Sequence, residues 1–344
     1  MFETAWSCPS NIALVKYWGK KEGELQIPAN PSLSFTLSAC TTSCHMHVEA
    51  KPDDGNFSLH FTFDGERKPS FIPKILTFFE RIESLVPWLK THHITIATSN
   101  TFPHSSGIAS SASAFAAMAQ CLSDIHQQMG NQVEDPLAFA SELARIGSGS
   151  AARSLMGPCG VWGKHADFEG SNDRYSIAFA EIHPIFQDFR DTILIVESGK
   201  KSVSSTAGHE LMVGHPFAEA RYQQAHRNLS KLKDILMHGH LDLFYELVEE
   251  EAMTLHAMMM TGNPSYMLFK PETIAIIERL RDARKQKGLS MCFTLDAGAN
   301  VHVLYPNSEH EKVLNWINEE VAQYLENQRY LCDQIGNGAK RIDI

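Results

Sequence analysis

A loop of small side chains at residues 100–114 is the first segment whose residues could bind a ligand. Its Ser105, Ser106 and Gly107 follow Pro103 and precede an apolar, alanine-rich stretch with helical spacing. A loop without bulky side chains lets backbone N–H groups face a ligand, and a helix start adds unpaired donors and a partial positive charge. We predict that this loop holds the phosphates of ATP, although a serine-rich helix cap would look similar. It does not match the Walker pattern.

A second segment rich in glycine and serine, residues 147–154, leads into a helical turn that carries Arg153. A guanidinium there can pair bidentately with a carboxylate, while the hydroxyls of Ser148 and Ser150 and nearby backbone amides bind phosphate. A capped helix with Arg153 in an ordinary salt bridge explains the same residues. Both readings stay open on this segment alone.

Two later segments combine charge with turn residues. In residues 197–206, Lys200 and Lys201 lie beside a hydroxyl cluster after a predicted strand, which suits an anion site, although a solvated loop is the simpler interpretation. Asp296 stands among apolar and small residues between two apolar strands. A carboxylate there needs partners for its charge and could act as a general base, although Asp-Ala-Gly is also good turn chemistry.

Near the N-terminus, Lys16 and Tyr17 come at the end of an apolar strand pattern. Lys16 is placed to reach an anion, and the Tyr17 hydroxyl can donate a hydrogen bond. The simpler interpretation is a strand end whose lysine extends its charged group into solvent.

The elements that must position these residues mix strand and helix patterns. Alternating or β-branched patterns predict strands, and apolar residues at helical spacing predict helices. The predicted strands are 11–17, 33–37, 44–49, 58–63, 93–97, 192–196, 292–295 and 301–305, and the predicted helices are 71–84, 109–128, 135–145, 209–238 with a break near Gly214, 242–259, 271–287 and 313–326. The mixture predicts an α+β fold with a boundary after residue 188.

The bulk composition narrows the function classes. The 344 residues are 43% hydrophobic and 20% charged with a formal net charge of −10, as in a globular protein that nucleic acid and anionic lipid repel. No apolar run is long enough to span a membrane, and no signal peptide is expected. The seven scattered cysteines favour a reduced cytoplasm over a disulfide framework.

One cluster raises the question of a metal site. On the predicted strand 44–49, alternation puts His45, His47 and Glu49 on one face and Cys44 on the other. A half-buried strand with its histidines toward water is the favoured interpretation, because no second pair of ligands completes a four-ligand site.

Taken in order, these segments resemble one family. Residues 103–111, with the pattern Pro-x-x-x-Gly-Ile-Ala-Ser-Ser, resemble the signature loop of the GHMP kinase superfamily. The companions are similar to the motifs of mevalonate diphosphate decarboxylases: Asn11 with residues 16–20, residues 148–154, residues 203–206 and residues 296–300. The resemblance extends from residue 8 to residue 305.

The resemblance implies a fold and a reaction. Residues 1–188 would form a ribosomal-protein-S5-like domain and residues 189–344 a ferredoxin-like domain, with ATP and substrate between them. The family usually forms homodimers and uses Mg-ATP. The implied reaction phosphorylates the 3-hydroxyl of mevalonate 5-diphosphate and yields isopentenyl diphosphate, CO2, ADP and phosphate.

The resemblance also implies residue roles. Asp296 would orient or deprotonate the 3-hydroxyl, Arg153 would hold the carboxylate that is lost, and Lys200 or Lys201 would neutralise charge on the transferred phosphoryl group. Substrate binding would fall to Lys16, Tyr17, Ser148, Ser150, Arg153, Ser204 and Ser205. The ATP phosphates would contact Pro103, Ser105, Ser106, Gly107, Ala109, Ser110, Ser111 and Ser113, with Mg²⁺ near Ser110 or Ser111.

Three other interpretations stay open. Small departures from the family pattern at residues 104–106, Ile108, Ala152 and Ala299 bear on the substrate, and some relatives decarboxylate the 5-monophosphate. A GHMP-type kinase would be expected to show a late glycine-rich run, where this chain has Asp296. A non-catalytic sensor or an S5-like RNA-binding module is disfavoured by the acidic balance and by the lack of basic patches with interleaved aromatic residues.

Overall fold

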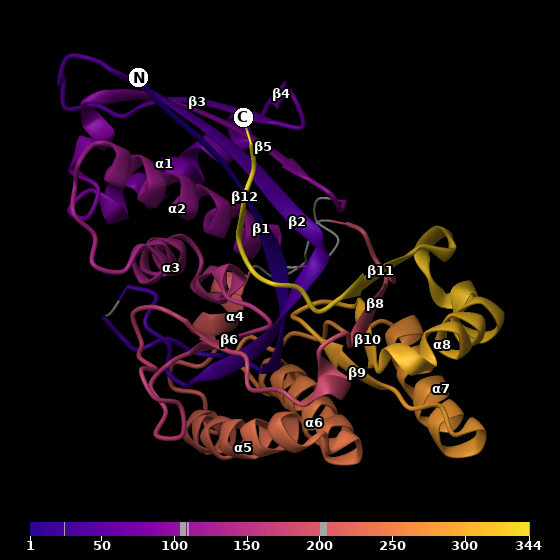
Figure 1. The fold of residues 1–344 in the computed structure, drawn as a ribbon. Coiled ribbons are helices and arrows are strands. Elements are labelled where there is room, and N and C mark those ends of the chain that lie inside the picture. Colours follow the sequence, from indigo (N-terminus) through magenta and orange to yellow (C-terminus); the bar gives the residue numbers. More distant parts are fainter. Residues whose placement is uncertain (24, 104–107, 109, 200–204, 344) are drawn as a thin grey trace.

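The computed structural model describes residues 1–23, 25–103, 108, 110–199 and 205–343. Two sheets organise this part of the chain, and helices cover them (Figure 1). The mixture of helices and strands confirms the predicted α+β class. No helix in these ranges is long and apolar enough to cross a membrane.

The larger sheet contains eight strands and forms the N-terminal unit with the helices packed on it. Its main path runs β12-β1-β2-β5-β3-β4, and β6 and β7 extend it from β2. Only β3 and β5 pair in parallel. The strands are β1 (Phe2–Val15), β2 (Ser32–Ala50), β3 (Ser58–Phe63), β4 (Glu66–Arg67), β5 (His92–Asn100), β6 (Cys159–Trp162), β7 (Ile177–Phe179) and β12 (Lys340–Arg341).

Three helices pack against this sheet and build its hydrophobic core. They are α1 (Ile72–Ile82), α2 (Ser110–Gln128) and α3 (Pro136–Gly147). In α1 the buried side chains recur every three or four residues, at Ile75, Phe78, Phe79 and Ile82, so one stripe of the helix faces the sheet. Asp135 begins α3 by accepting two backbone N–H bonds, as an N-cap residue does.

The smaller sheet, with its helices, forms the C-terminal unit. Its four strands are antiparallel in the order β11-β8-β10-β9. The strands are β8 (Arg190–Leu194), β9 (Cys292–Leu295), β10 (Val301–Tyr305) and β11 (Tyr330–Gln334), and the helices are α4 (Ser205–Glu210), α5 (Ala218–His238), α6 (Leu241–Met260), α7 (Pro271–Lys287) and α8 (His310–Trp316).

Short helical turns connect these elements. They are the 3₁₀ turns η1 (Pro69–Phe71), η2 (Pro87–Lys90), η3 (Gly149–Leu155), η4 (Pro184–Phe186), η5 (Asn307–Glu309), η7 (Ala322–Tyr324) and η8 (Glu326–Gln328), and the π turn η6 (Ile317–Val321). The most important for the site is η3, because it carries Arg153 directly after α3.

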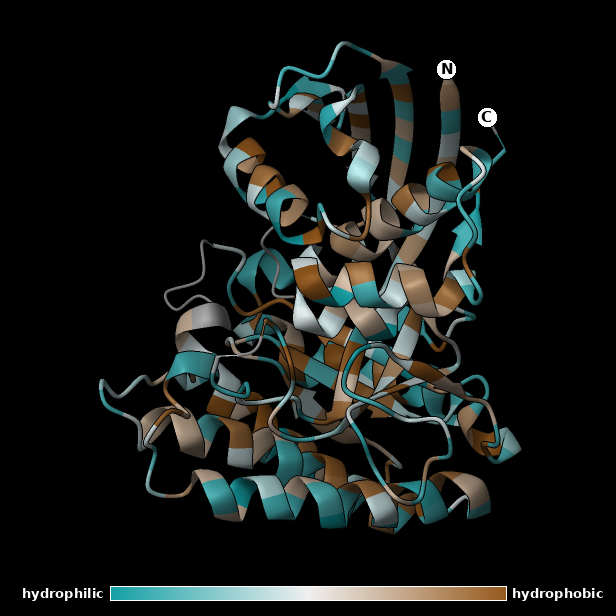
Figure 2. Cartoon of the chain, turned by 90° about the vertical axis from the view of Figure 1, so that its left-hand side faces the viewer, coloured by the Kyte–Doolittle hydropathy of each residue, from teal (hydrophilic) through white to brown (hydrophobic). Residues whose placement is uncertain are grey.

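One hydrophobic cluster extends across the two units. Phe35 of β2 stacks on Phe244 of α6 at 5.8 Å between ring centroids, and Phe186 and Phe189 pack against the same pair. Hydrophobic and hydrophilic bands alternate along the covering helices and along the strands at the top of the view, while the strands near its centre are mostly hydrophobic (Figure 2). The two units therefore share part of their core.

Most predicted elements are confirmed within a few residues, and the errors are instructive. The predicted strands 33–37 and 44–49 are parts of one strand, β2, which continues through the exposed Ser38 and Ala39. The helix predicted at 313–326 is wrong beyond Trp316, where π and 3₁₀ turns follow. β4, β6, β7, β11 and β12 were not predicted, because strands of two to five residues carry little periodic signal. The boundary after residue 188 stays a prediction.

Candidate active site

The second half of β1, at Ser10 and Asn11, connects the predicted site segments. The Ser10 hydroxyl donates to the carbonyl of Ile108, at the end of the predicted nucleotide loop, over 2.7 Å. The next residue, Asn11, donates through its side-chain amide to the Ser150 carbonyl at 3.1 Å and to the Ser154 hydroxyl at 2.7 Å. One strand therefore holds the loop before α2 and the η3 segment together.

Arg153 is buried where η3 meets β1 and β2. Its guanidinium donates to Ser34 Oγ at 3.1 Å, Ser32 Oγ at 2.5 Å and Asn11 Oδ1 at 3.4 Å. All three acceptors are neutral, and the described residues form no salt bridge with Arg153. A Cβ at Gly160 would lie 2.8 Å from Arg153 Cβ, so only glycine allows this approach.

The Arg153 charge is retained despite its burial. Burial lowers the pKa of the guanidinium to about 10, and the charges of Asp296 and Tyr17 oppose that shift. The group is therefore protonated at neutral pH. A buried cation held only by neutral oxygens can still attract a carboxylate.

Lys16 and Asp296 form a pair that joins the two units. Lys16 Nζ lies 3.5 Å from Asp296 Oδ1, and the side chains are 2% and 27% exposed. The interpretation of Lys16 as a solvent-reaching lysine is therefore wrong. Burial lowers the Lys16 pKa, while the negative charges of Asp296 and Glu251 oppose the shift.

His256 contacts the backbone of Asp296. Its Nε2 lies 3.1 Å from the Asp296 carbonyl oxygen, and its ring stacks on Phe269 at 4.3 Å and an interplanar angle of 8°. Burial lowers the His256 pKa to about 4, so the ring is neutral at neutral pH and can donate from Nε2. Sequence reasoning missed His256, because nothing near it marks it among the 17 histidines.

Tyr17 is enclosed by aromatic rings. It contacts Trp162 edge-on at 4.6 Å and His209 at 4.2 Å between ring centroids. A Cβ at Gly149 would lie 2.8 Å from the Tyr17 ring, so the glycine of η3 makes room for it. Burial raises the pKa of Tyr17, which keeps the phenol protonated and able to donate.

His209 of α4 fixes the segment that follows Tyr17. Its Nδ1 accepts the Gly19 N–H over 3.0 Å, and its ring packs on Trp18 at 4.7 Å. Burial, with contributions from Lys20 and Arg153, lowers the His209 pKa to about 3, so the ring is neutral. Sequence reasoning missed this contact too, since 190 residues separate the partners.

Donor groups converge in this region without a protein acceptor. Within the described residues, Lys16 Nζ and Tyr17 Oη are buried and form no hydrogen bond. The 3.5 Å between Lys16 Nζ and Asp296 Oδ1 is an ion pair at the long limit of a hydrogen bond. Buried donors of this kind normally have partners. An anionic ligand would supply them.

The remaining predicted site residues fall into two groups. Ser110 and Ser111 begin α2 and are partly exposed, whereas Ser113 is buried with its hydroxyl 2.6 Å from Thr42 Oγ1, so it faces the sheet. Pro103, Ser148 and Ser150 are also partly exposed. Ser105, Ser106, Gly107, Ala109, Lys200, Lys201 and Ser204, together with the side chain of Ser205, lie outside the described residues. The ligand contacts assigned to all of these residues stay predictions.

The face of β2 with His45 is separate from this site. Cys44, Met46 and Val48 are buried and His45 and His47 are partly exposed, which confirms the predicted alternation. The one group of potential metal ligands in the described ranges does not include them and consists of exposed Asp234 and His238 in the last turn of α5 and His240 just after it.

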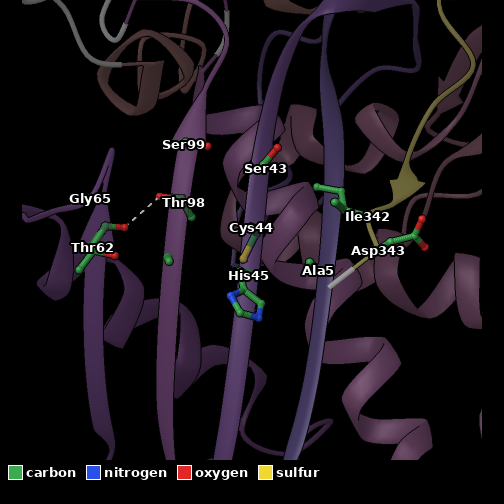
Figure 3. Close-up of a pocket in the computed structure, with 11 residues that line it drawn as sticks. Ala5, Ser43, Cys44, His45, Thr62, Gly65, Thr98, Ser99, Ile342 and Asp343 are labelled. Atoms are coloured by element: carbon green, nitrogen blue, oxygen red, sulfur yellow. Dashed lines mark hydrogen bonds between the residues drawn. The ribbon is translucent and has the colours of Figure 1, made fainter.

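A pocket of about 410 Å³ lies on this outer face of the N-terminal unit (Figure 3). It is lined by β1, β2, β3 and β5 and by Ile342 and Asp343 near the C-terminus. None of its lining residues is a predicted site residue. The buried and converging charges lie elsewhere, at Lys16, Arg153 and Asp296.

The chain is similar to known proteins over most of its length. Residues 8–178 match a diphosphomevalonate decarboxylase-like N-terminal domain, and residues 192–340 match a mevalonate 5-diphosphate decarboxylase C-terminal domain. The chain is 27% identical over 330 residues to diphosphomevalonate decarboxylase from Debaryomyces hansenii, covering 92% of this chain and 83% of the relative. It is 29% identical over 294 residues to phosphomevalonate decarboxylase from Haloferax volcanii, covering 84% of each.

A solved structure shares the complete fold. It shows the protein MDDEF in complex with MVAPP, AMPPCP and magnesium, with a TM-score of 0.85, 24% identity and 99% coverage of both chains. This similarity confirms the expected two-part α+β fold.

Proposed function

The chain belongs to the diphosphomevalonate decarboxylase family, and from this premise we propose that it converts mevalonate 5-diphosphate and ATP to isopentenyl diphosphate, CO2, ADP and phosphate. The observation that carries the proposal is the Lys16–Asp296 pair beside Arg153, a buried guanidinium whose hydrogen-bond acceptors among the described residues are all neutral. A substrate with a hydroxyl, a carboxylate and a diphosphate has a complementary group for each of these features.

In the first step Asp296 accepts the proton of the tertiary hydroxyl. The hydroxyl oxygen then forms a bond to the γ-phosphorus of ATP, and the bond from that phosphorus to ADP breaks. Lys16 holds the Asp296 carboxylate in place at 3.5 Å. Such a site works by placement and electrostatics.

In the second step the C3–O bond breaks and releases phosphate. Electrons of the bond between C2 and the carboxylate carbon then form the double bond, and CO2 leaves. Arg153 orients the carboxylate before this step. Its neutral hydroxyl and amide partners can take up the guanidinium again once the substrate charge is gone.

We assign the ATP phosphates to the loop that ends at α2, with Lys200 or Lys201 near the transferred group. Ser110 and Ser111 are partly exposed, and their hydroxyls would hold Mg²⁺, which prefers oxygen ligands and would neutralise charge on the ATP phosphates. MDDEF, whose fold this chain shares, binds AMPPCP and magnesium. The start of α2 adds unpaired N–H donors for the phosphates.

The second candidate function is decarboxylation of the 5-monophosphate. It is favoured by one observation, the 29% identity to the phosphomevalonate decarboxylase of Haloferax volcanii. We prefer mevalonate 5-diphosphate as the substrate, because both matched domains and the Debaryomyces hansenii relative are named as decarboxylases of that compound. Lys16 Nζ and Tyr17 Oη are two donors available for its phosphates.

An assay of ATP-dependent CO2 release tests both candidates. We expect CO2 and ADP in equal amounts from mevalonate 5-diphosphate, and little turnover of mevalonate 5-phosphate or mevalonate. Faster turnover of the 5-monophosphate would transfer the assignment to the second candidate. ADP formation without CO2 would show a kinase instead.

We also propose that residues 1–188 form the ATP- and substrate-binding domain, that residues 189–344 form the second domain, and that the protein acts as a homodimer in the cytoplasm. The support is the family membership and the reduced, scattered cysteines. The formal net charge of −10 disfavours nucleic acid and anionic membranes as partners. Light scattering on the purified protein tests the dimer.

A further inference from the structure

A fully buried ion pair lies behind Lys16. Arg221 of α5 and Glu251 of α6 face each other with both side chains at 0% exposure. The pair is bidentate, with Nη1 3.0 Å from Oε1 and Nη2 2.6 Å from Oε2, and Asn228 donates to Oε1 at 2.8 Å.

This pair also binds both peptide groups of Lys16. The Lys16 N–H donates to Glu251 Oε2 over 2.9 Å, and Arg221 Nη2 donates to the Lys16 carbonyl over 3.2 Å. Asn30 donates to the same carbonyl at 2.9 Å. Because β1 ends at Val15, Lys16 lies beyond the strand, and two helices of the C-terminal unit supply the partners that a neighbouring strand would otherwise provide.

Stability alone does not account for this arrangement. Removing two charges from water costs several kcal/mol per ion, and apolar residues of similar volume often stabilise a protein as well or better. A buried ion pair can therefore indicate which neighbouring groups it holds in position. Here it orients Lys16, whose ammonium faces Asp296 across the two units.

We propose that Arg221 and Glu251 are positioning residues for the reaction: they fix the Lys16 backbone so that its ammonium meets Asp296 and the substrate. The inference rests on the proposed function, because that function gives Lys16 and Asp296 their chemical roles. Neither Arg221 nor Glu251 needs to touch the reacting atoms.

The chain offers a matched control on the same helix. Glu249 lies two residues before Glu251 and is paired with Arg284 at 2.6 Å and Arg281 at 3.4 Å, on a side of α6 that has no contact with Lys16. Glu249→Gln and Glu251→Gln each remove one charge from an ion pair and keep the side-chain shape. They differ in whether Lys16 loses its support.

We expect Glu251→Gln to lower kcat about 100-fold with little change in KM for ATP, because a displacement of about 1 Å can cost that much. Glu249→Gln should keep kcat within about threefold. In hydrogen exchange, the peptide that contains Lys16 should exchange faster in Glu251→Gln only. Equal kcat and equal exchange in the two variants would overturn the proposal.

A double variant separates positioning from folding, because a lone buried arginine destabilises a protein. Arg221→Met with Glu251→Met removes both charges, and we expect its melting temperature to recover relative to Glu251→Gln while kcat stays low. Recovery of kcat together with stability would show a structural role only. If the unaltered protein released no CO2, the proposed function would fail, and the exchange of the Lys16 amide would still decide the positioning role.

Discussion

At the scale of single residues, the site consists of charges that the fold has withdrawn from water. Arg153 is buried against hydroxyl and amide oxygens, and Lys16 is buried against one carboxylate. Groups in such surroundings interact strongly with a ligand charge because little water screens them. Small changes in their chemistry should therefore have large effects on turnover.

Asp296→Asn should leave nucleotide binding largely intact and lower turnover about 10²–10⁴-fold, because an amide cannot accept the hydroxyl proton. Calorimetric titration with AMPPCP and the CO2 assay measure the two effects separately. Near-normal turnover would remove Asp296 from its role as the base.

Arg153→Lys should lower kcat/KM for the acid substrate about 30-fold, equal to about 2 kcal/mol, because a lysine keeps the charge and loses the planar fork. Arg284→Lys, a change at an arginine paired with Glu249, is the control and should leave kcat/KM unaltered. A change in melting temperature alone at Arg153 would mean that it only supports the fold.

The sequence predicts these residues because their short motifs are contiguous. Arg153 and Asp296 stand in contiguous segments of small residues that resemble the motifs of the family, whereas their composition alone leaves a salt bridge and a turn equally open. His209 and His256 carry no such context, and their contacts with Gly19 and with the Asp296 carbonyl exist only after distant elements pack. Ser113 lies inside the predicted nucleotide loop, and its hydroxyl contacts Thr42 of the sheet, a contact that no local pattern indicates.

At the scale of elements, the end of β1 is held by helices of the other unit. His209 of α4 accepts the Gly19 N–H, and α5 and α6 hold the Lys16 peptide. Strand and helix periodicity predicts the end of β1, α5 and α6 separately, and of α4 it predicts only the last two residues. It does not predict which helix meets which strand end, because that depends on the packing of the two units.

Stability should fall in mild acid because of His209. Its folded pKa of about 3 lies below the ordinary value of 6.5, so the unfolded chain binds the extra proton as the pH falls below about 6.5. Between about pH 7 and pH 5 this linkage removes about 2 kcal/mol from the free energy of unfolding.

His209→Gln should reduce that loss, because the glutamine oxygen can still accept the Gly19 N–H and does not titrate. Urea unfolding of both proteins at the two pH values measures the difference. An identical loss in the two proteins would mean that His209 does not contribute.

At the scale of the whole molecule, Asp333 of β11 ties the two units together. Its carboxylate accepts the N–H groups of Ser38, Ala39 and Cys40 in β2 at 2.7–2.9 Å. These bonds explain why β2 continues through two exposed residues where the sequence predicted a gap. The partner on β11 lies almost 300 residues away, so no local pattern could show it.

Asp333→Asn should lower the free energy of unfolding by about 3 kcal/mol, since an amide cannot accept at both oxygen positions and one backbone N–H would then face a donor. Denaturant unfolding measures this loss, with Asp188→Asn at an exposed position as the control. Equal stability of the two variants would contradict the role of Asp333.

The last strand, β12, pairs with the first strand, β1, so the chain ends in the sheet in which it begins. The polypeptide leaves the larger sheet after Phe179, builds the smaller one, and comes back at Lys340, so both chain ends lie on the same side of the molecule (Figure 1). The smaller unit is therefore tethered by two separate backbone crossings. Both crossings restrict how far the two units can move apart. A backbone cut in residues 180–189 would leave two fragments that still share the larger sheet, because β12 pairs with β1.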